Sequence, residues 1–172
     1  EFMQYVTGHE MFHRVQFNHD PDWATTWENS AWIYEGTARN MEDVAFANVD
    51  TWSNCQGVAF SYCNEVNDYL ASTQADITSS GMRYEANLFW TYFREQYGTT
   101  LTEPQRGVDA LVELWEQMAT AESVAAVNNA LAVLSPGTSF DEAFRQFTVA
   151  NWTKDLSGVP DASYNYADED QV

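Results

Sequence analysis

Two histidines and a glutamate near the start of the chain have the types and spacing that metal-assisted hydrolysis requires. His9, Glu10 and His13 form the pattern HExxH. On a helix, residues four apart lie on one face, so His9 and His13 can bind one ion while Glu10 reaches a water molecule beside it. Zinc lowers the pKa of such a water from about 16 to about 7, and Glu10 would accept its proton as general base. The alternative is an amphipathic helix whose histidines lie four residues apart by chance.

A catalytic zinc site usually has three protein ligands, so a third residue must complete this one. Glu35 is one candidate, because a second helix can fold back antiparallel and bring its carboxylate to the histidines. His19 is the other, since His9, His13 and His19 have the spacing of the metzincin pattern HExxHxxGxxH. Gln16 stands where that pattern has glycine. Glutamine is penalised in the left-handed conformation of the turn that glycine allows, which favours Glu35.

The residues around Glu35 carry a family resemblance. The stretch WIYEGTA, from Trp32 to Ala38, follows HExxH and resembles the gluzincins, the thermolysin-like superfamily with a glutamate ligand on a second helix. More narrowly, it resembles a group of secreted bacterial and archaeal metalloproteases with the pattern W-x-x-EGTA. The resemblance is good over residues 8–43 and weaker over Tyr84–Gly98 and Phe144–Asn151.

This resemblance implies a set of roles. His9, His13 and Glu35 would bind Zn²⁺, Glu10 would be the general base, and the two helices would form the floor of a cleft. Thermolysin itself has an aspartate four residues after the glutamate ligand, which orients a histidine. Arg39 occupies that position here, so we expect the orienting carboxylate at Glu42 or Asp43.

A donor must also stabilise the oxyanion that develops during peptide hydrolysis. Tyr84 follows Gly81 at the start of a predicted helix and is the candidate, with Arg83 as the reserve. The alternative for Tyr84 is an ordinary aromatic residue at a helix start.

Composition limits the classes of protein. A chain of 172 residues predicts one globular domain, and a net charge of −19 argues against nucleic-acid binding. No apolar window is long enough to predict a membrane span. Such acidity is typical of a secreted protein or one adapted to high salt, so we expect an extracellular or cell-surface location. Cys55 and Cys63 could form a disulfide there or remain thiols in a reducing compartment.

Hydrophobic periodicity predicts a mainly α fold: a compact multi-helix zincin-type catalytic domain with little or no β structure, in which the HExxH helix packs on the glutamate-bearing helix. The domain spans residues 1–153, and an acidic tail spans 154–172. The β subdomain that precedes the zinc helix in gluzincins is not in this chain, which we expect to be a mature product or a fragment. The helices are predicted at residues 2–17, 29–46, 58–70, 82–97, 104–119, 124–134 and 139–150, with a loop at 72–80.

Three functional hypotheses follow. The first is a zinc metallopeptidase that cleaves a protein or peptide substrate with a metal-activated water. The second is a non-catalytic extracellular assembly or surface protein that retains a zincin-like site, with His19 as a fourth ligand of a structural zinc. The third is a metzincin-like protease that uses His19 as its third ligand. Substrate specificity and oligomeric state are not predicted by the sequence.

Overall fold

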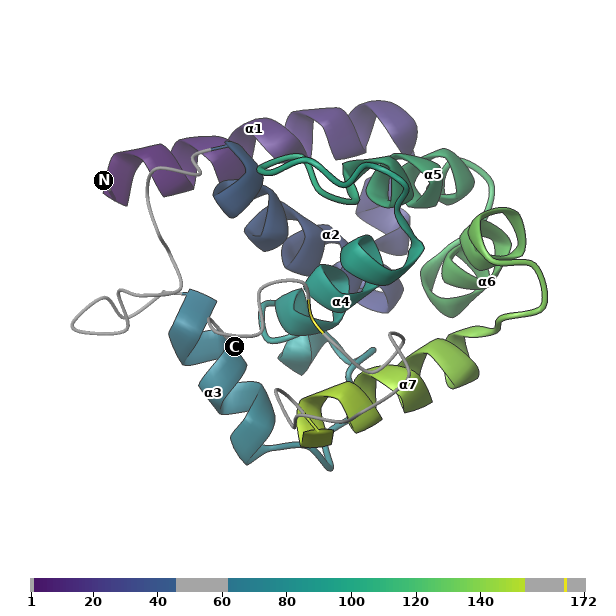
Figure 1. The fold of residues 1–172 in the computed structure, drawn as a ribbon. Helices are drawn as coiled ribbons and strands as arrows, with labels where there is room; N and C mark the ends of the chain where they lie inside the picture. The colour runs from purple at the N-terminus through teal and green to yellow at the C-terminus, as the bar shows by residue number, and fades with distance from the viewer. Residues whose placement is uncertain (1, 46–61, 154–165, 167–172) are drawn as a thin grey trace.

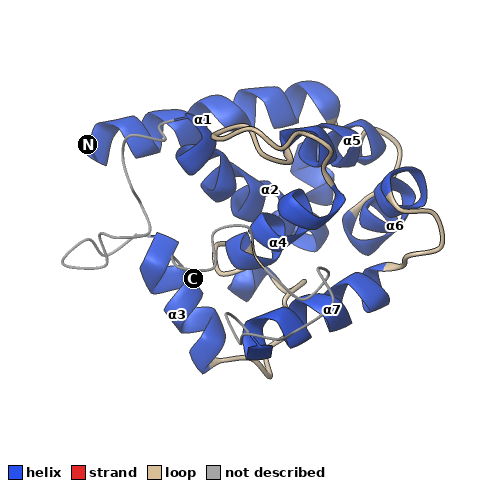
Figure 2. Ribbon diagram, viewed as in Figure 1, coloured by secondary structure: helices blue, strands red, loops and turns tan. Residues whose placement is uncertain are grey.

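Helices joined by loops and turns make up the part of the chain that the structure describes (Figure 2). The structure, a computed structural model, describes residues 2–45, 62–153 and 166. In these ranges it contains no strand, so the predicted mainly α fold is confirmed there. The elements in chain order are α1 (Phe2–His19), α2 (Trp23–Ala45), α3 (Tyr62–Ala71), a short 3₁₀ helix η1 (Ser80–Met82), α4 (Asn87–Tyr97), α5 (Val108–Met118), α6 (Ser123–Leu134) and α7 (Phe140–Thr153).

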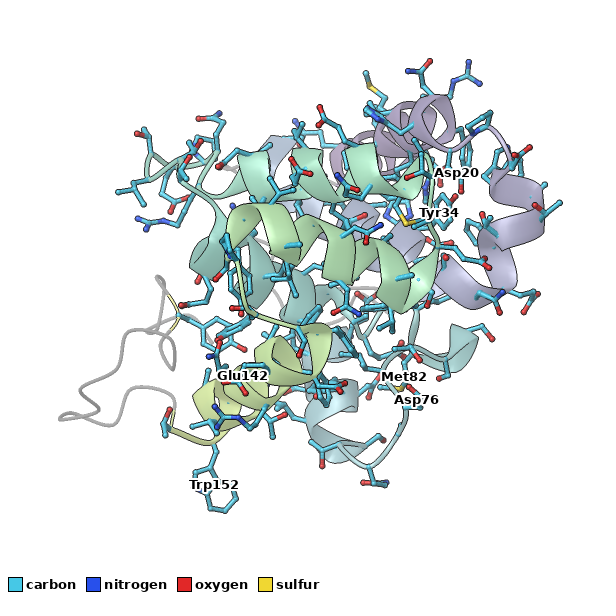
Figure 3. The ribbon with its side chains drawn as sticks, turned by 90° about the vertical axis from the view of Figure 1, so that its right-hand side faces the viewer. Asp20, Tyr34, Asp76, Met82, Glu142 and Trp152 are labelled. Atoms are coloured by element: carbon cyan, nitrogen blue, oxygen red, sulfur yellow. The ribbon has the colours of Figure 1, made fainter. Side chains whose placement is uncertain are left out.

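The two longest helices, α1 and α2, pack against each other as an antiparallel pair (Figure 1). The turn between them is short because Asp20 organises it. Its Oδ1 accepts the backbone N–H of Asp22 at 3.0 Å, and its Oδ2 accepts hydroxyl hydrogen bonds from Thr26 and Tyr34 (Figure 3). With the turn closed in this way, α2 begins at Trp23, well before the predicted start near residue 29. The predicted boundary was wrong because side-chain capping at Asp20 is not visible in hydrophobic periodicity.

Helix α2 runs through the centre of the molecule, with α1 on one side and α4 on the other (Figure 1). Every residue from 30 to 40 is buried. Trp32 of α2 stacks on Trp90 of α4 with ring centroids 4.9 Å apart, and both side chains are fully buried. Phe89, Tyr92 and Phe93 of α4 are also fully buried, and Tyr97 packs partly buried at its end. Phe147 of α7 closes the opposite side of this aromatic core, with its ring 5.4 Å from that of Phe89.

The start of α4 differs from the sequence prediction, whereas its end agrees with it. Residues 83–86 form turns, so the helix begins at Asn87 and not at Met82. It ends before Gly98, as predicted, but Gly98 has φ −80° and is not in the left-handed conformation of a glycine C′ residue. A Cβ on Gly98 would lie 2.2 Å from the Cα of Gly107. Glycine is therefore needed there for close backbone approach.

The last helix has a side-chain cap at its start. Ser139 Oγ accepts the backbone N–H of Glu142 at 3.3 Å, the interaction of an N-cap serine. Beyond α7, Tyr166 is buried and its hydroxyl donates to Asn151 Oδ1 at 2.7 Å. The rest of the acidic tail, Cys55 and the side chain of Cys63 lie outside the described residues, so the predictions made for them stay predictions. None of the described helices has the length and apolarity of a membrane-spanning segment.

Candidate metal centre

The α1–α2 pair brings three of the predicted site residues together in the interior. His9 and His13 lie one turn apart on α1, and Glu35 faces them from α2. Glu35 Oε2 is 3.0 Å from His9 Nε2 and 3.5 Å from His13 Nε2, and the two Nε2 atoms are 3.0 Å apart. All three residues are buried, with at most 9% of their surface exposed. Tetrahedral zinc at normal bond lengths places its ligand atoms about 3.3 Å apart, so one ion fits this group.

The outer nitrogen of His13 is held by Gln16. Gln16 Nε2 donates to the backbone oxygen of Tyr34 at 2.9 Å and to Thr37 Oγ1 at 3.0 Å, while the Thr37 hydroxyl donates to the Ile33 oxygen. The amide orientation is therefore determined, and Gln16 Oε1 must accept the hydrogen bond from His13 Nδ1 at 2.6 Å. With its proton on Nδ1, neutral His13 presents a bare Nε2 to the centre of the group.

The outer nitrogen of His9 is held by Glu42. His9 Nδ1 donates to Glu42 Oε1 at 2.9 Å, and the same oxygen accepts a hydrogen bond from Arg39 Nη1 at 2.7 Å. The prediction of an orienting carboxylate at Glu42 or Asp43 is thus confirmed for Glu42, while the side chain of Asp43 lies outside the described residues. Arg39 forms two further hydrogen bonds with Glu65 of α3. No sequence pattern indicated Glu65, because its contact depends on how α3 packs.

The inward-facing atoms of the group repel one another unless a positive charge lies between them. Two bare imidazole nitrogens and a carboxylate oxygen are all acceptors. Burial lowers the pKa of His9, but hydrogen bonds to Glu35 and Glu42 outweigh it and raise this pKa to about 9. Burial raises the pKa of Glu35, but His13 and His9 more than offset it and hold the pKa at about 2. Without a metal ion, a proton on His9 supplies the missing positive charge.

The EGTA stretch of α2 has a spatial explanation at each residue. Glu35 is a member of the metal group, and Thr37 Oγ1 accepts the hydrogen bond from Gln16 Nε2. A Cβ on Gly36 would lie 2.5 Å from Trp90 Cδ1, so only glycine lets this tryptophan pack against α2. The Trp90 indole N–H donates to the backbone oxygen of Trp32 at 2.8 Å, which fixes the ring there. Ala38 is fully buried.

The two predicted catalytic residues lie close to the group. Glu10 follows His9 on α1, and its side chain is exposed. Tyr84 is half-buried in the turn before α4, and its ring centroid is 6.2 Å from that of His9. Burial and the nearby Glu35 raise the pKa of Tyr84, so its hydroxyl keeps its proton and can act as a donor. The guanidinium carbons of Arg39 and Arg83 lie 5.2 and 5.1 Å from the centroid of the Tyr84 ring.

His19 does not join the group. Helix α1 continues through Gln16 to His19, so the sharp turn of the metzincin pattern is not formed here. His19 instead lines a small apolar pocket with Val15 of α1 and with residues of α5 that include Trp115. Glu35 thus lies against the two histidines, whereas His19 lies in the apolar pocket between α1 and α5.

Comparison with protein-family models, with curated proteins and with solved structures finds no match to this chain.

Proposed function

We propose that this protein is a zinc metallopeptidase of gluzincin type that acts outside the cell or at the cell surface. His9, His13 and Glu35 bind the ion, and Glu10 is the general base. The observation that carries the proposal is the mutual spacing of 3.0 to 3.5 Å between three inward-facing acceptor atoms in a buried site. Two imidazoles and one carboxylate are the ligand set of a catalytic gluzincin zinc.

The number of ligands favours a catalytic site over a structural one. A structural zinc usually has four protein ligands, whereas a catalytic zinc has three and keeps one position for water or substrate. Among the described residues, the group contains only His9, His13 and Glu35. His19, the fourth ligand of the non-catalytic alternative, lies elsewhere. When bound, zinc would polarise the scissile carbonyl and lower the pKa of a water molecule.

The protein's own residues supply the proton transfers. Glu10 accepts a proton from the attacking water and passes it to the nitrogen of the leaving amine. Its exposure gives substrate access to its carboxylate, in contrast to the buried Glu35. The Tyr84 hydroxyl donates a hydrogen bond to the substrate carbonyl oxygen as negative charge develops there, and Arg83 is the alternative donor.

The test is Glu10→Gln, assayed with a quenched fluorescent peptide and with a zinc assay. We expect the rate of peptide cleavage to fall by at least about 100-fold, because the base is lost, while the zinc content stays the same. Glu116→Gln is the control, since Glu116 is an exposed acid on α5, and it should leave both readouts unchanged. Cleavage by Glu10→Gln at the parental rate would contradict the mechanism. A parental chain that binds zinc and cleaves no peptide would instead support the non-catalytic surface protein.

A further inference from the structure

A continuous buried chain of polar contacts connects the metal group to helices α3 and α4. From His9 it passes through Glu42 to Arg39 of α2, as described above. Arg39 Nη2 then donates to Glu65 Oε1 at 2.7 Å, and Arg39 Nε donates to Glu65 Oε2 at 3.0 Å. Asn87 Nδ2 at the start of α4 donates to Glu65 Oε2, also at 3.0 Å.

Every residue that continues these polar contacts beyond His9 is buried. Arg39 is 9% exposed, Glu42 4%, Glu65 6% and Asn87 0%. Ionised groups are rarely buried to this extent unless they are paired, because desolvation is costly. Glu65 lies outside the HExxH and EGTA patterns, and the proposed hydrolysis gives it no part. Its burial next to Arg39 therefore needs a separate explanation.

The geometry of Arg39 shows what Glu65 does. A guanidinium presents a rigid planar fork that binds a single carboxylate through two parallel hydrogen bonds. With Glu42 as its only partner, Arg39 would form that two-bond contact and draw Glu42 Oε1 away from His9. Glu65 occupies the Nε and Nη2 edge of Arg39, so that Nη1 is the atom that reaches Glu42. Glu42 Oε1 then stays shared between Arg39 and His9 Nδ1.

Charge balance supports the same explanation. Burial raises the pKa of Glu65 to about 7 against the opposing effect of Arg39, so its carboxylate is mainly ionised at pH 8. At that pH the buried cluster contains the carboxylates of Glu35, Glu42 and Glu65 and the guanidinium of Arg39, with the two histidines neutral once a metal ion is bound. This leaves two unbalanced negative charges, which one divalent cation neutralises. A neutral residue at position 65 would leave the loaded cluster with a net positive charge, which is unfavourable in a buried site.

We propose that Glu65 and Asn87 are positioning residues of the metal centre, which act on His9 through Arg39 and Glu42. Glu65 keeps Glu42 Oε1, the acceptor of the His9 Nδ1 hydrogen bond, in place. It also gives the cluster the negative charge that a divalent cation balances. Asn87 fixes the Glu65 carboxylate. The metal site is thus assembled from α1 to α4, and not from the α1–α2 pair alone.

The first measurement is the zinc dissociation constant of the full chain at pH 8, by competition with a chromophoric chelator. We expect Glu65→Gln to weaken zinc binding by about 10- to 100-fold, the usual loss when a residue behind a metal ligand is removed. Asn87→Ser removes a single hydrogen bond and should weaken binding by a smaller factor. This milder variant also keeps the test available should Glu65→Gln not fold.

The matched control is Val66→Ala. Val66 is the neighbouring residue on α3, is 6% exposed and belongs to the hydrophobic core. Its truncation therefore weakens the packing of α3 without removing any of the polar contacts between His9 and Asn87. We expect it to lower thermal stability and to leave zinc affinity unchanged. Equal losses of zinc affinity in Val66→Ala and Glu65→Gln at matched stability would overturn the proposal, because Glu65 would then have only a structural role.

The second measurement does not require a bound ion. The His9 Nδ1 proton that Glu42 accepts should give a slowly exchanging low-field signal in proton NMR. We expect this signal in the parental chain and in Val66→Ala, and its loss by fast exchange in Glu65→Gln. An unchanged signal in Glu65→Gln would contradict the positioning role, whether or not the chain binds zinc or cleaves peptides.

Discussion

Gln16 Oε1 accepts a hydrogen bond from His13 Nδ1 at 2.6 Å, and this contact determines which nitrogen of His13 faces the metal group. The contact is set from α2, because the Gln16 amide nitrogen is bound by the Tyr34 oxygen and the Thr37 hydroxyl. Contacts from α2 thereby determine the tautomer of His13 on α1, that is, which of its two ring nitrogens has the proton.

The first prediction concerns Gln16→Leu. Loss of the acceptor frees His13 Nδ1 and lets the ring rotate or change tautomer, so we expect zinc affinity to fall by about 10- to 100-fold. Chelator competition measures this change. Gln105→Leu is a control, because Gln105 is exposed in the segment before α5, and it should bind zinc as the parental chain does. Parental affinity in Gln16→Leu would show that His13 does not need this contact.

Gly36→Ala tests the close approach of α4 to the glutamate-bearing helix. The new methyl group would lie 2.5 Å from Trp90 Cδ1, and the buried indole has no room to move freely. Overpacking of this kind costs about 1 to 3 kcal/mol of unfolding free energy. Urea denaturation measures the loss. Gly81→Ala is the matched control, since its nearest neighbour is Ser79 Oγ at an ordinary 3.8 Å, and it should change stability by less than about 0.5 kcal/mol. Equal stabilities of the two variants would contradict the packing explanation.

Asp109 allows a prediction about pH dependence away from the metal group. Burial raises the pKa of Asp109, but the N–H groups of Thr99 and Thr100 and the Thr99 hydroxyl bind the carboxylate and together lower its pKa to about 2. Because this pKa is lower in the folded than in the unfolded protein, the ionised carboxylate of Asp109 stabilises the folded state. Its contribution is complete above the ordinary pKa of 3.8 and is lost as the pH falls through about 2.

We therefore expect Asp109→Asn to be less stable than the parental chain at pH 6, with a difference in unfolding free energy that narrows below pH 4 and is lost as the pH falls through about 2. Urea denaturation across this pH range is the measurement. A difference that stays constant down to pH 2 would show that the charge of Asp109 is not what stabilises the segment before α5.

The sequence predicted the metal group better than its surroundings, for a physical reason. The relation of His9 to His13 is local, because residues four apart share a helix face. Glu35 was predicted because its neighbours resemble a known pattern, and the structure places it against both histidines. The metal-binding role of this group, and the catalytic roles of Glu10 and Tyr84, stay predictions.

Of the residues that support the group, Glu42 was predicted, whereas the supporting roles of Gln16 and Glu65 were not. Gln16 was interpreted as a departure from glycine, whereas the structure gives it an acceptor role that depends on Tyr34 and Thr37. Glu65 has no distinguishing neighbours in the sequence, and only the packing of α3 brings it to Arg39. The contacts of Gln16 with Tyr34 and Thr37, and of Glu65 with Arg39, join different helices, and helix periodicity contains no information about such contacts.

The most direct test of the central claim is the zinc content and affinity of the purified chain with and without Glu35→Ala. We expect one zinc ion per parental chain. The variant should lose affinity by more than about 100-fold, because a direct ligand contributes more than the residues behind it. Glu116→Ala, which removes an exposed acid on α5, should bind zinc normally. A parental chain without zinc affinity, or a Glu35→Ala variant that binds zinc as tightly as the parental chain, would contradict the account.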